Sequence, residues 1–157
     1  MDLRTKGFTL VEVLVALAVL LILITMAVPA FTGSMQGTKA DTDIGDLRRA
    51  LNFARMTAID RGITTRIRPT AQGSVWSGEL TVYDSTGTPA NVLRVVPAMS
   101  GGATLTLTSD VTSIDFNNLG GLSAPATPVS FNYVRGAQTR TLNVCLNGRI
   151  VLGGSCG

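Results

Sequence analysis

Lys6-Gly7-Phe8-Thr9-Leu10-Val11-Glu12 begins a long apolar segment and places one carboxylate inside it, since Val11 to Ala30 carries no other charge. A charged side chain left unpaired in a bilayer costs roughly 2.5–3.5 kcal/mol on insertion scales. We therefore expect Glu12 to meet a cation. Cleavage of the chain after Gly7 would create one, because the new amino group of Phe8 would lie one helical turn from Glu12 on the same face.

The apolar segment is long enough to cross a membrane. Phe8–Phe31 exceeds the roughly 20 residues that a helix needs to span the hydrocarbon core. A secretory signal peptide would place its small cleavage residue after the apolar run, whereas Gly7 precedes it, and a generic membrane anchor would give Glu12 no role. Arg4 and Lys6 precede the run and no cation follows it closely. The positive-inside rule then places the N-terminus in the cytoplasm and the remainder outside.

Helical periodicity continues beyond the apolar run. Pro29 should kink the helix, and Gly33 and Gly37 bracket a polar stretch that we expect to loosen it. From about Thr38, apolar residues return at steps of three and four, and Gly62 suits the position just after a helix. The predicted organisation is a leader at 1–7, the transmembrane half of a long helix at 8–31, its amphipathic half at 32–62 and a β domain at 63–157.

Beyond residue 62 the pattern changes to period two, with β-branched runs separated by Gly, Pro, Asn and Asp. Short strands without intervening helices predict an antiparallel β domain of two sheets with the helix packed against one, an α+β fold. Asn147-Gly148 fits a two-residue type I′ hairpin turn. The predicted strands are Thr64–Arg68, Glu79–Tyr83, Val92–Val96, Ala103–Thr108, Ser113–Phe116, Val129–Val134, Thr139–Leu146 and Ile150–Leu152.

The N-terminal motif carries a family resemblance. Gly7-Phe8-Thr9-Leu10-Val11-Glu12 behind a basic leader resembles the processing site of type IV prepilins and type II secretion pseudopilins. In that family a membrane peptidase cuts after the glycine and methylates the new N-terminus. The resemblance implies that Gly7 ends the leader, that Phe8 becomes the methylated first residue and that Glu12 acts in assembly. It also implies prepilin peptidase, other pilins or pseudopilins and the inner membrane as partners.

Later segments are similar to the GspH/FimT (FimU-like) group of minor pilins and pseudopilins. They are Leu51-Asn52-Phe53-Ala54-Arg55, Ile114-Asp115-Phe116 before Gly120, and Leu142-Asn143-Val144 before Gly148-Arg149-Ile150. The resemblance implies a pilin-like fold and a structural, non-enzymatic subunit that primes or caps a type IV pilus, without cofactor or small-molecule substrate. A pseudopilin of a type II secretion system is the alternative. Either protein is a single-pass inner-membrane protein with a periplasmic domain before it enters the pilus or pseudopilus.

Cys145 and Cys156 are the only cysteines in the chain. The predicted orientation places them outside the cytoplasm, where disulfides persist. We expect them to be joined, which would stabilise the fold by about 3 kcal/mol in the chain-entropy model. Two free buried thiols and a nucleophilic Cys156 are the alternatives, but a nucleophile would lack a histidine base, because the chain contains no histidine.

Neither the net charge of the chain nor its acidic residues predict a charged partner or a bound metal ion. Loss of residues 1–7 removes two of 13 basic and one of 10 acidic residues, so the mature net charge is small. Asp41, Asp43 and Asp46 lack the downstream Glu and fixed Gly of a calcium loop. We expect them to be solvated at the start of a helix, where acidic residues favour the dipole. Trp76 could stack on a base or a partner, but we expect it to cover the edge of the sheet.

DNA binding is the second class of function, because some FimT-like pilins resemble competence factors that capture DNA through C-terminal arginines. Arg135, Arg140 and Arg149 stand in the last part of the chain and would contact phosphates. However, Ile150-Val151-Leu152 follows Arg149 with no further cation, unlike an arginine-rich tail. We therefore favour the structural subunit, with the three arginines on a solvated face.

Overall fold

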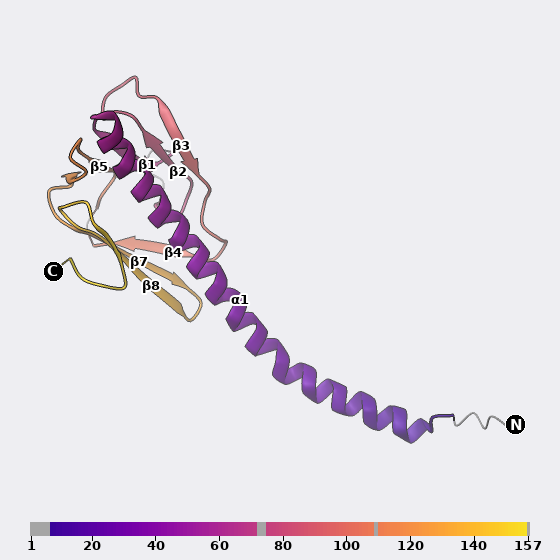
Figure 1. Cartoon of the computed structure of the whole chain (residues 1–157). Coiled ribbons are helices and arrows are strands. Elements are labelled where there is room, and N and C mark those ends of the chain that lie inside the picture. Colours follow the sequence, from indigo (N-terminus) through magenta and orange to yellow (C-terminus); the bar gives the residue numbers. More distant parts are fainter. Residues whose placement is uncertain (1–6, 72–74, 109, 157) are drawn as a thin grey trace, which may run out of the picture. The chain divides into compact units, whose positions relative to one another are not determined.

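The computed structural model describes residues 7–71, 75–108 and 110–156. Arg4, Lys6 and most of the predicted leader lie outside the described residues. The described chain forms one long helix followed by short strands (Figure 1). This order confirms the predicted α+β fold.

The helix α1 (Leu10–Arg61) is continuous over 52 residues. The loosening predicted around Gly33 and Gly37 is therefore absent, and Pro29 does not end the helix. A proline lacks only its own N–H, and long apolar helices tolerate the loss of that one hydrogen bond. At the other end, Gly62 has a φ of 65°, and Ile63 N donates to Ala58 O at 3.1 Å. This is the glycine-terminated helix end that the sequence predicts.

The chain divides between Met35 and Gln36 into two compact units. In the first unit, every side chain that the structure describes is exposed. This part of α1 is long and apolar enough to cross a membrane, and its apolar window is 0% buried within the chain. The division falls slightly beyond the boundary predicted after Phe31.

The second unit contains two antiparallel sheets, one with strand order β3-β2-β1-β5-β6 and one with order β4-β7-β8-β9. The sequence missed β6, which is short and pairs with β5 through an irregular register. Only its first residue is buried, so it shows little periodicity. The strands are β1 (Thr65–Pro69), β2 (Leu80–Tyr83), β3 (Val92–Val96), β4 (Thr104–Leu107), β5 (Ile114–Phe116), β6 (Leu122–Ala124), β7 (Val129–Arg135), β8 (Gln138–Val144) and β9 (Ile150–Leu152).

Within this unit α1 packs on both sheets, and the prediction that it packs on one is wrong (Figure 1). Near Asp43 the helix lies against the four-stranded sheet, where the Tyr133 hydroxyl of β7 donates to the Asp43 carboxylate at 2.7 Å. Further along it lies against the five-stranded sheet, where Thr65 Oγ1 of β1 donates to Ala54 O at 2.9 Å. The helix is therefore one wall of a core that both sheets share.

Small residues on one face of α1 let its backbone approach the sheets. Ala40, Ala50, Ala54 and Ala58 are each 0% exposed. Close approach of this kind is what allows a strand hydroxyl to reach a helix carbonyl, as Thr65 does. Larger apolar side chains from the helix and from both sheets fill the core, among them Ile44, Leu47, Leu51, Ile67, Phe116, Phe131 and Leu142.

A buried carboxylate ties three elements of this unit together. Asp43 is 8% exposed and accepts hydrogen bonds from Ser100 N at 3.1 Å and from Ser100 Oγ at 3.0 Å. It also accepts from Tyr133, whose pKa is raised to about 12 by burial and by this hydrogen bond. The Tyr133 hydroxyl therefore stays protonated and remains a donor at neutral pH. The carboxylate thus joins α1 to the loop before β4 and to β7.

The prediction that Asp43 is solvated at a helix start is wrong. The helix begins at Leu10, far upstream, so the helix dipole does not explain the residue. Asp43 instead falls on the buried stripe of α1 between Ala40 and Leu47. Its spacing from those residues was the signal in the sequence, because positions three and four apart share one face of a helix.

Two glycine turns meet beside the end of α1. Gly120 and Gly148 have φ values of 78° and 75°, and Gly148 N donates to Cys145 O at 2.8 Å. No residue other than glycine has a positive φ among the described residues, so Asn147 does not, and the predicted type I′ turn is wrong. The loop is the longer hairpin type that ends in one left-handed glycine. A Cβ on Gly148 would lie 1.7 Å from Gly120 O, so the approach of the two turns requires glycine.

We expect Asp43→Ala to lower the free energy of unfolding by about 3 kcal/mol, because the Tyr133 hydroxyl and the Ser100 amide lose their acceptor in the core. Denaturant unfolding of the full-length protein in nonionic detergent micelles measures this. Asp46→Ala is the matched control. Asp46 pairs with Arg49 on the exposed side of α1, so its loss should cost less than about 0.5 kcal/mol. Equal effects of the two substitutions would contradict the assigned role of Asp43.

Candidate functional site

The N-terminal motif lies at the start of α1. Thr9 precedes the helix, and its Oγ1 accepts a hydrogen bond from Glu12 N at 3.2 Å. Val13 N donates to Thr9 O at 3.2 Å. Thr9 and Glu12 thus have the spacing of a capping box, and a carboxylate in the first turn also favours the helix dipole. The motif therefore has a local structural role in starting the helix directly after Thr9.

Phe8, which precedes α1, and Glu12 of its first turn line one shallow groove with Ala16, Leu17 and Leu20. Phe8 is 81% exposed. In the uncut chain the nitrogen of Phe8 belongs to a peptide bond, so it has no charge to offer Glu12. Among the described residues no cation forms an ion pair with Glu12. The arrangement is a carboxylate on an apolar surface, close to the residue that would become the N-terminus.

Gly7 has open surroundings. A Cβ built on Gly7 would have nothing within 4 Å, and its φ is not in the left-handed region. The described part of the chain would therefore tolerate a side chain at this position. Within the described residues, the fold itself does not require a glycine at this position.

Cys145 and Cys156 are joined by a disulfide, with their Cα atoms 5.4 Å apart. Both alternatives, free thiols and a nucleophilic Cys156, are therefore wrong. The bond attaches the C-terminal tail to the residue that follows β8. The tail also lies along β8, because Gly153 N donates to Thr141 O at 2.8 Å and Asn143 Nδ2 donates to Gly154 O.

The three arginines considered for DNA contact do not form one cationic surface. Arg140 Nε pairs with Asp41 Oδ1 at 2.7 Å. Arg135 ends β7, and its Nε and Nη1 are buried without a hydrogen-bond partner. Arg149 is exposed beyond the other end of β8, where it donates to Cys156 O at 3.4 Å. DNA contact through these residues stays a prediction, and the arrangement offers no continuous track for a phosphate backbone.

Trp76 is part of the core and does not present its ring to a partner. It is 6% exposed, and its Nε1 donates to Val111 O at 2.7 Å. Its ring meets that of Phe131 edge to face, with centroids 5.3 Å apart. The stacking role considered for Trp76 is therefore not available in this fold.

The three aspartates compared with a calcium loop have separate partners. Asp41 pairs with Arg140, Asp43 with Ser100 and Tyr133, and Asp46 with Arg49. In the part of the chain that the structure describes, no group of three or more His, Cys, Asp and Glu side chains is placed to hold a metal ion.

Two protein-family models match the chain. The model described as the prokaryotic N-terminal methylation motif matches residues 3–28. The model described as type II transport protein GspH matches residues 43–149, which is most of the chain. No protein with a curated description matches the sequence significantly.

Solved structures share the fold. The crystal structure of the type IV minor pilin FimU from Pseudomonas aeruginosa strain PAO1 is 23% identical, with a TM-score of 0.62, and the match covers 74% of this chain and 99% of that chain. A second crystal form of FimU is 22% identical, with a TM-score of 0.63, and covers 80% and 98%. The minor pseudopilin EpsH from the type 2 secretion system of Vibrio cholerae is 14% identical, with a TM-score of 0.56, and covers 73% and 95%.

Replacing Cys145 and Cys156 together by serine should lower the free energy of unfolding by about 3 kcal/mol, because the unfolded chain regains the entropy of the opened loop. Thermal unfolding of the full-length protein in micelles, without reductant, measures the change. Ser155→Ala is the control, since it alters the same tail and keeps the disulfide. A double variant as stable as the wild type would show that the bond contributes nothing to the fold.

Proposed function

Because the chain belongs to the GspH family and is a minor pilin or pseudopilin, we propose that it is a structural subunit of a type IV pilus that primes or caps the filament. One observation carries the proposal. The methylation motif stands on an exposed apolar helix, and the GspH-type domain follows on the same helix. A pilus is favoured over a secretion machine because the chain resembles FimU more than EpsH in both identity and TM-score.

The proposed life cycle begins in the inner membrane. The N-terminus lies in the cytoplasm and the β domain in the periplasm, and prepilin peptidase cuts between Gly7 and Phe8. The new amino group of Phe8 is then methylated. The open surroundings of Gly7 support this proposal, because the need for a glycine then falls to the peptidase that must approach the backbone.

In the proposed assembly of subunits into the filament, the negative charge of Glu12 is the recognition element. After cleavage the amino group of Phe8, on the same subunit or on a neighbour, neutralises the Glu12 carboxylate among packed helices. In low-dielectric surroundings such a pair is much stronger than in water. Lipid already satisfies the apolar side chains of the helix, so specificity between subunits comes from packing and from this pair. The partners are therefore other pilins, which contact the helix and the side surfaces of the β domain.

A type II secretion pseudopilin remains the second candidate, because the fold is also that of EpsH. The phenotype of a gene deletion distinguishes the pilus subunit from the secretion pseudopilin. Loss of surface pili with normal protein secretion supports the pilus, whereas loss of secretion with normal piliation assigns the protein to the secretion machine.

Gly7→Val should leave the protein at its precursor mass in the inner membrane, because a branched side chain blocks the approach of the peptidase to the bond. Intact-mass spectrometry of the membrane fraction measures this. The control is Gly33→Val, a glycine of α1 that also has nothing within 4 Å of a built Cβ and should be processed normally. A mature N-terminus at a residue other than Phe8 would overturn the proposed cleavage.

Glu12→Ala and Glu12→Gln should both permit cleavage and insertion but reduce the amount of the protein in sheared filaments, because neither side chain neutralises the Phe8 amino group. Quantitative immunoblots of sheared pili measure incorporation. Thr9→Ala is the matched control, since it removes the capping hydroxyl, worth about 1 kcal/mol, and keeps the carboxylate. If Thr9→Ala reduced incorporation as strongly, the role of Glu12 would lie in starting the helix and not in charge pairing.

A further inference from the structure

A pocket on the outer face of the five-stranded sheet is lined by two arginines. Its volume is about 150 Å³. It lies opposite the core, because the neighbouring residues Thr65 and Ile67 of β1 face inward and are fully buried. Its walls include Arg66 and Arg68 of β1, Tyr83 of β2, and Ser85, Thr86 and Thr88 of the loop between β2 and β3.

Arg66 is already neutralised. Its Nε and Nη2 donate to the two carboxylate oxygens of Asp115 at 2.8 and 2.7 Å. Asp115 is 3% exposed, and this hydrogen bonding raises the pKa of Arg66 above its ordinary value. Arg66 Nη1 also donates to Thr86 O at 3.0 Å. Arg66 is therefore part of the wall and holds the loop, and it adds no net charge to the pocket.

Arg68 has no such partner. Its guanidinium carbon lies 4.9 Å from the centre of the Tyr83 ring, and its Nε is buried without a hydrogen bond. Buried donors are nearly always paired in folded proteins. Among the described residues no carboxylate lines the pocket. The positive charge of Arg68 therefore has no carboxylate partner. Stacking on the Tyr83 ring holds the planar guanidinium in one orientation.

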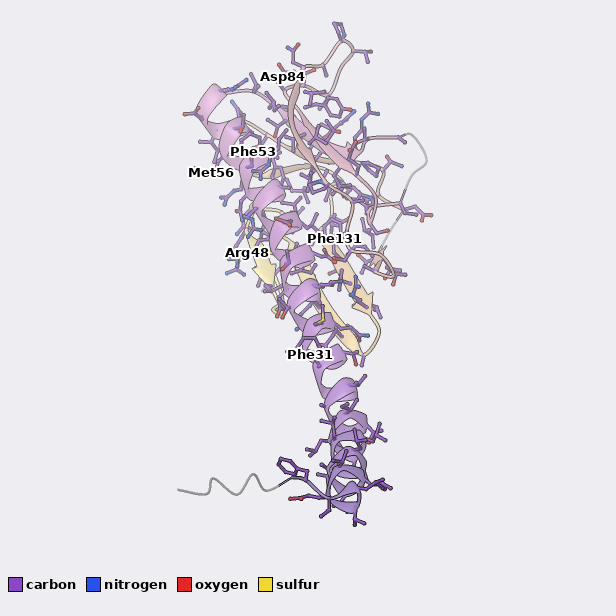
Figure 2. All side chains as sticks on the ribbon, turned by 90° about the vertical axis from the view of Figure 1, so that its right-hand side faces the viewer. Phe31, Arg48, Phe53, Met56, Asp84 and Phe131 are labelled. Carbon is purple, nitrogen blue, oxygen red and sulfur yellow. A yellow bond between two sulfur atoms is a disulfide. The ribbon has the colours of Figure 1, made fainter. Side chains whose placement is uncertain are left out.

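The loop over the pocket is fastened at its base. Asn91 N and Nδ2 donate to the two carboxylate oxygens of Asp84, each at 2.8 Å. These bonds lower the pKa of Asp84, so the clamp persists at neutral pH. Asp84 is labelled in Figure 2 at the edge of the domain, where the loop begins. Arg66 also holds the loop, through its hydrogen bond to Thr86 O. The hydroxyl groups of Ser85, Thr86 and Thr88 therefore form a fixed rim around the pocket.

We propose that this pocket binds a carboxylate group through the fork of Arg68. The planar guanidinium matches the two oxygens of a carboxylate, and one unbalanced positive charge matches one negative charge. The pocket has a volume of about 150 Å³. That space accepts the end of an acidic side chain or a small free acid. The source is either an acidic side chain of a neighbouring protein or a free carboxylic acid.

The first experiment tests the chemistry with glutarate as the probe. The full-length protein, labelled with ¹⁵N and ¹³C in nonionic micelles, is titrated while the Arg68 Nε–H and Tyr83 ring signals are followed by NMR. Saturable shifts of both signals are expected. Arg68→Lys keeps the charge and loses the fork, and we expect it to weaken the Tyr83 response about tenfold. Arg94→Gln is the control, because Arg94 stacks on Phe53 at 5.3 Å outside the pocket and its loss should change nothing.

No saturable shift with glutarate, or an equal response in Arg68→Lys, would overturn the proposal. Tighter binding of dimethyl phosphate than of glutarate would also overturn it and would assign the pocket to phosphodiesters. Because the Arg68→Lys protein could be misfolded, its spectrum outside the pocket is compared with that of the wild type. Thr88→Ala, which leaves both arginines in place, serves as the second variant and should weaken glutarate binding less than Arg68→Lys does.

The second experiment distinguishes the two sources of the carboxylate. A photo-crosslinking residue at Thr86, on the rim, is activated in assembled filaments, with the same residue at Thr106 of β4 as the control. Crosslinks from Thr86 to a peptide with Asp or Glu identify an acidic side chain of another subunit. Glutarate binding without such crosslinks identifies a free acid. This arm rests on the proposed filament function and the titration does not, so the failures of the two ideas are distinguishable.

Discussion

The helix α1 has to be stable in two environments, an apolar one around its first half and the surface of two sheets against its second half. The rest of the structure depends on this constraint. Before Met35 every described side chain is exposed and most are apolar, which suits lipid or neighbouring helices and is costly in water at about 25 cal/mol per Å². After Gln36 the buried side chains lie on one face. A helix that is apolar all round needs an apolar solvent, and one with a single apolar stripe needs only a partner surface.

The partner surface is formed by two sheets at once. Alanines of α1 bring the backbone close to both, and the Asp43 carboxylate adds directional bonds to Ser100 and Tyr133. Apolar packing alone is non-directional, so these hydrogen bonds define the rotation of the helix against the sheet.

Most arginines of the β domain discussed above are either paired with a carboxylate or far from one another. Arg66 and Arg140 each have a carboxylate partner, and Arg149 stands apart at the end of β8. Nucleic-acid binding depends on several cations acting on one backbone, and these arginines are dispersed or neutralised. Recognition by shape, apolar contact and single charged groups is the better fit to this surface, and that is the chemistry of contacts between protein subunits.

Local patterns in the sequence determined a large part of this protein. The position of Glu12 in an apolar run, the helix end at Gly62 and most strands follow from neighbours in the chain, because helix and strand periods are properties of a few consecutive residues. The pairing of Cys145 with Cys156 follows from their being the only two cysteines. The tertiary structure alone decided the pairing of β6, the hydrogen-bond partners of Asp43, the partner of Arg66 and the need for glycine at 148. Each of these depends on contact between residues far apart in the chain, such as Gly148 against Gly120, and a local pattern carries no information about which distant atoms will meet.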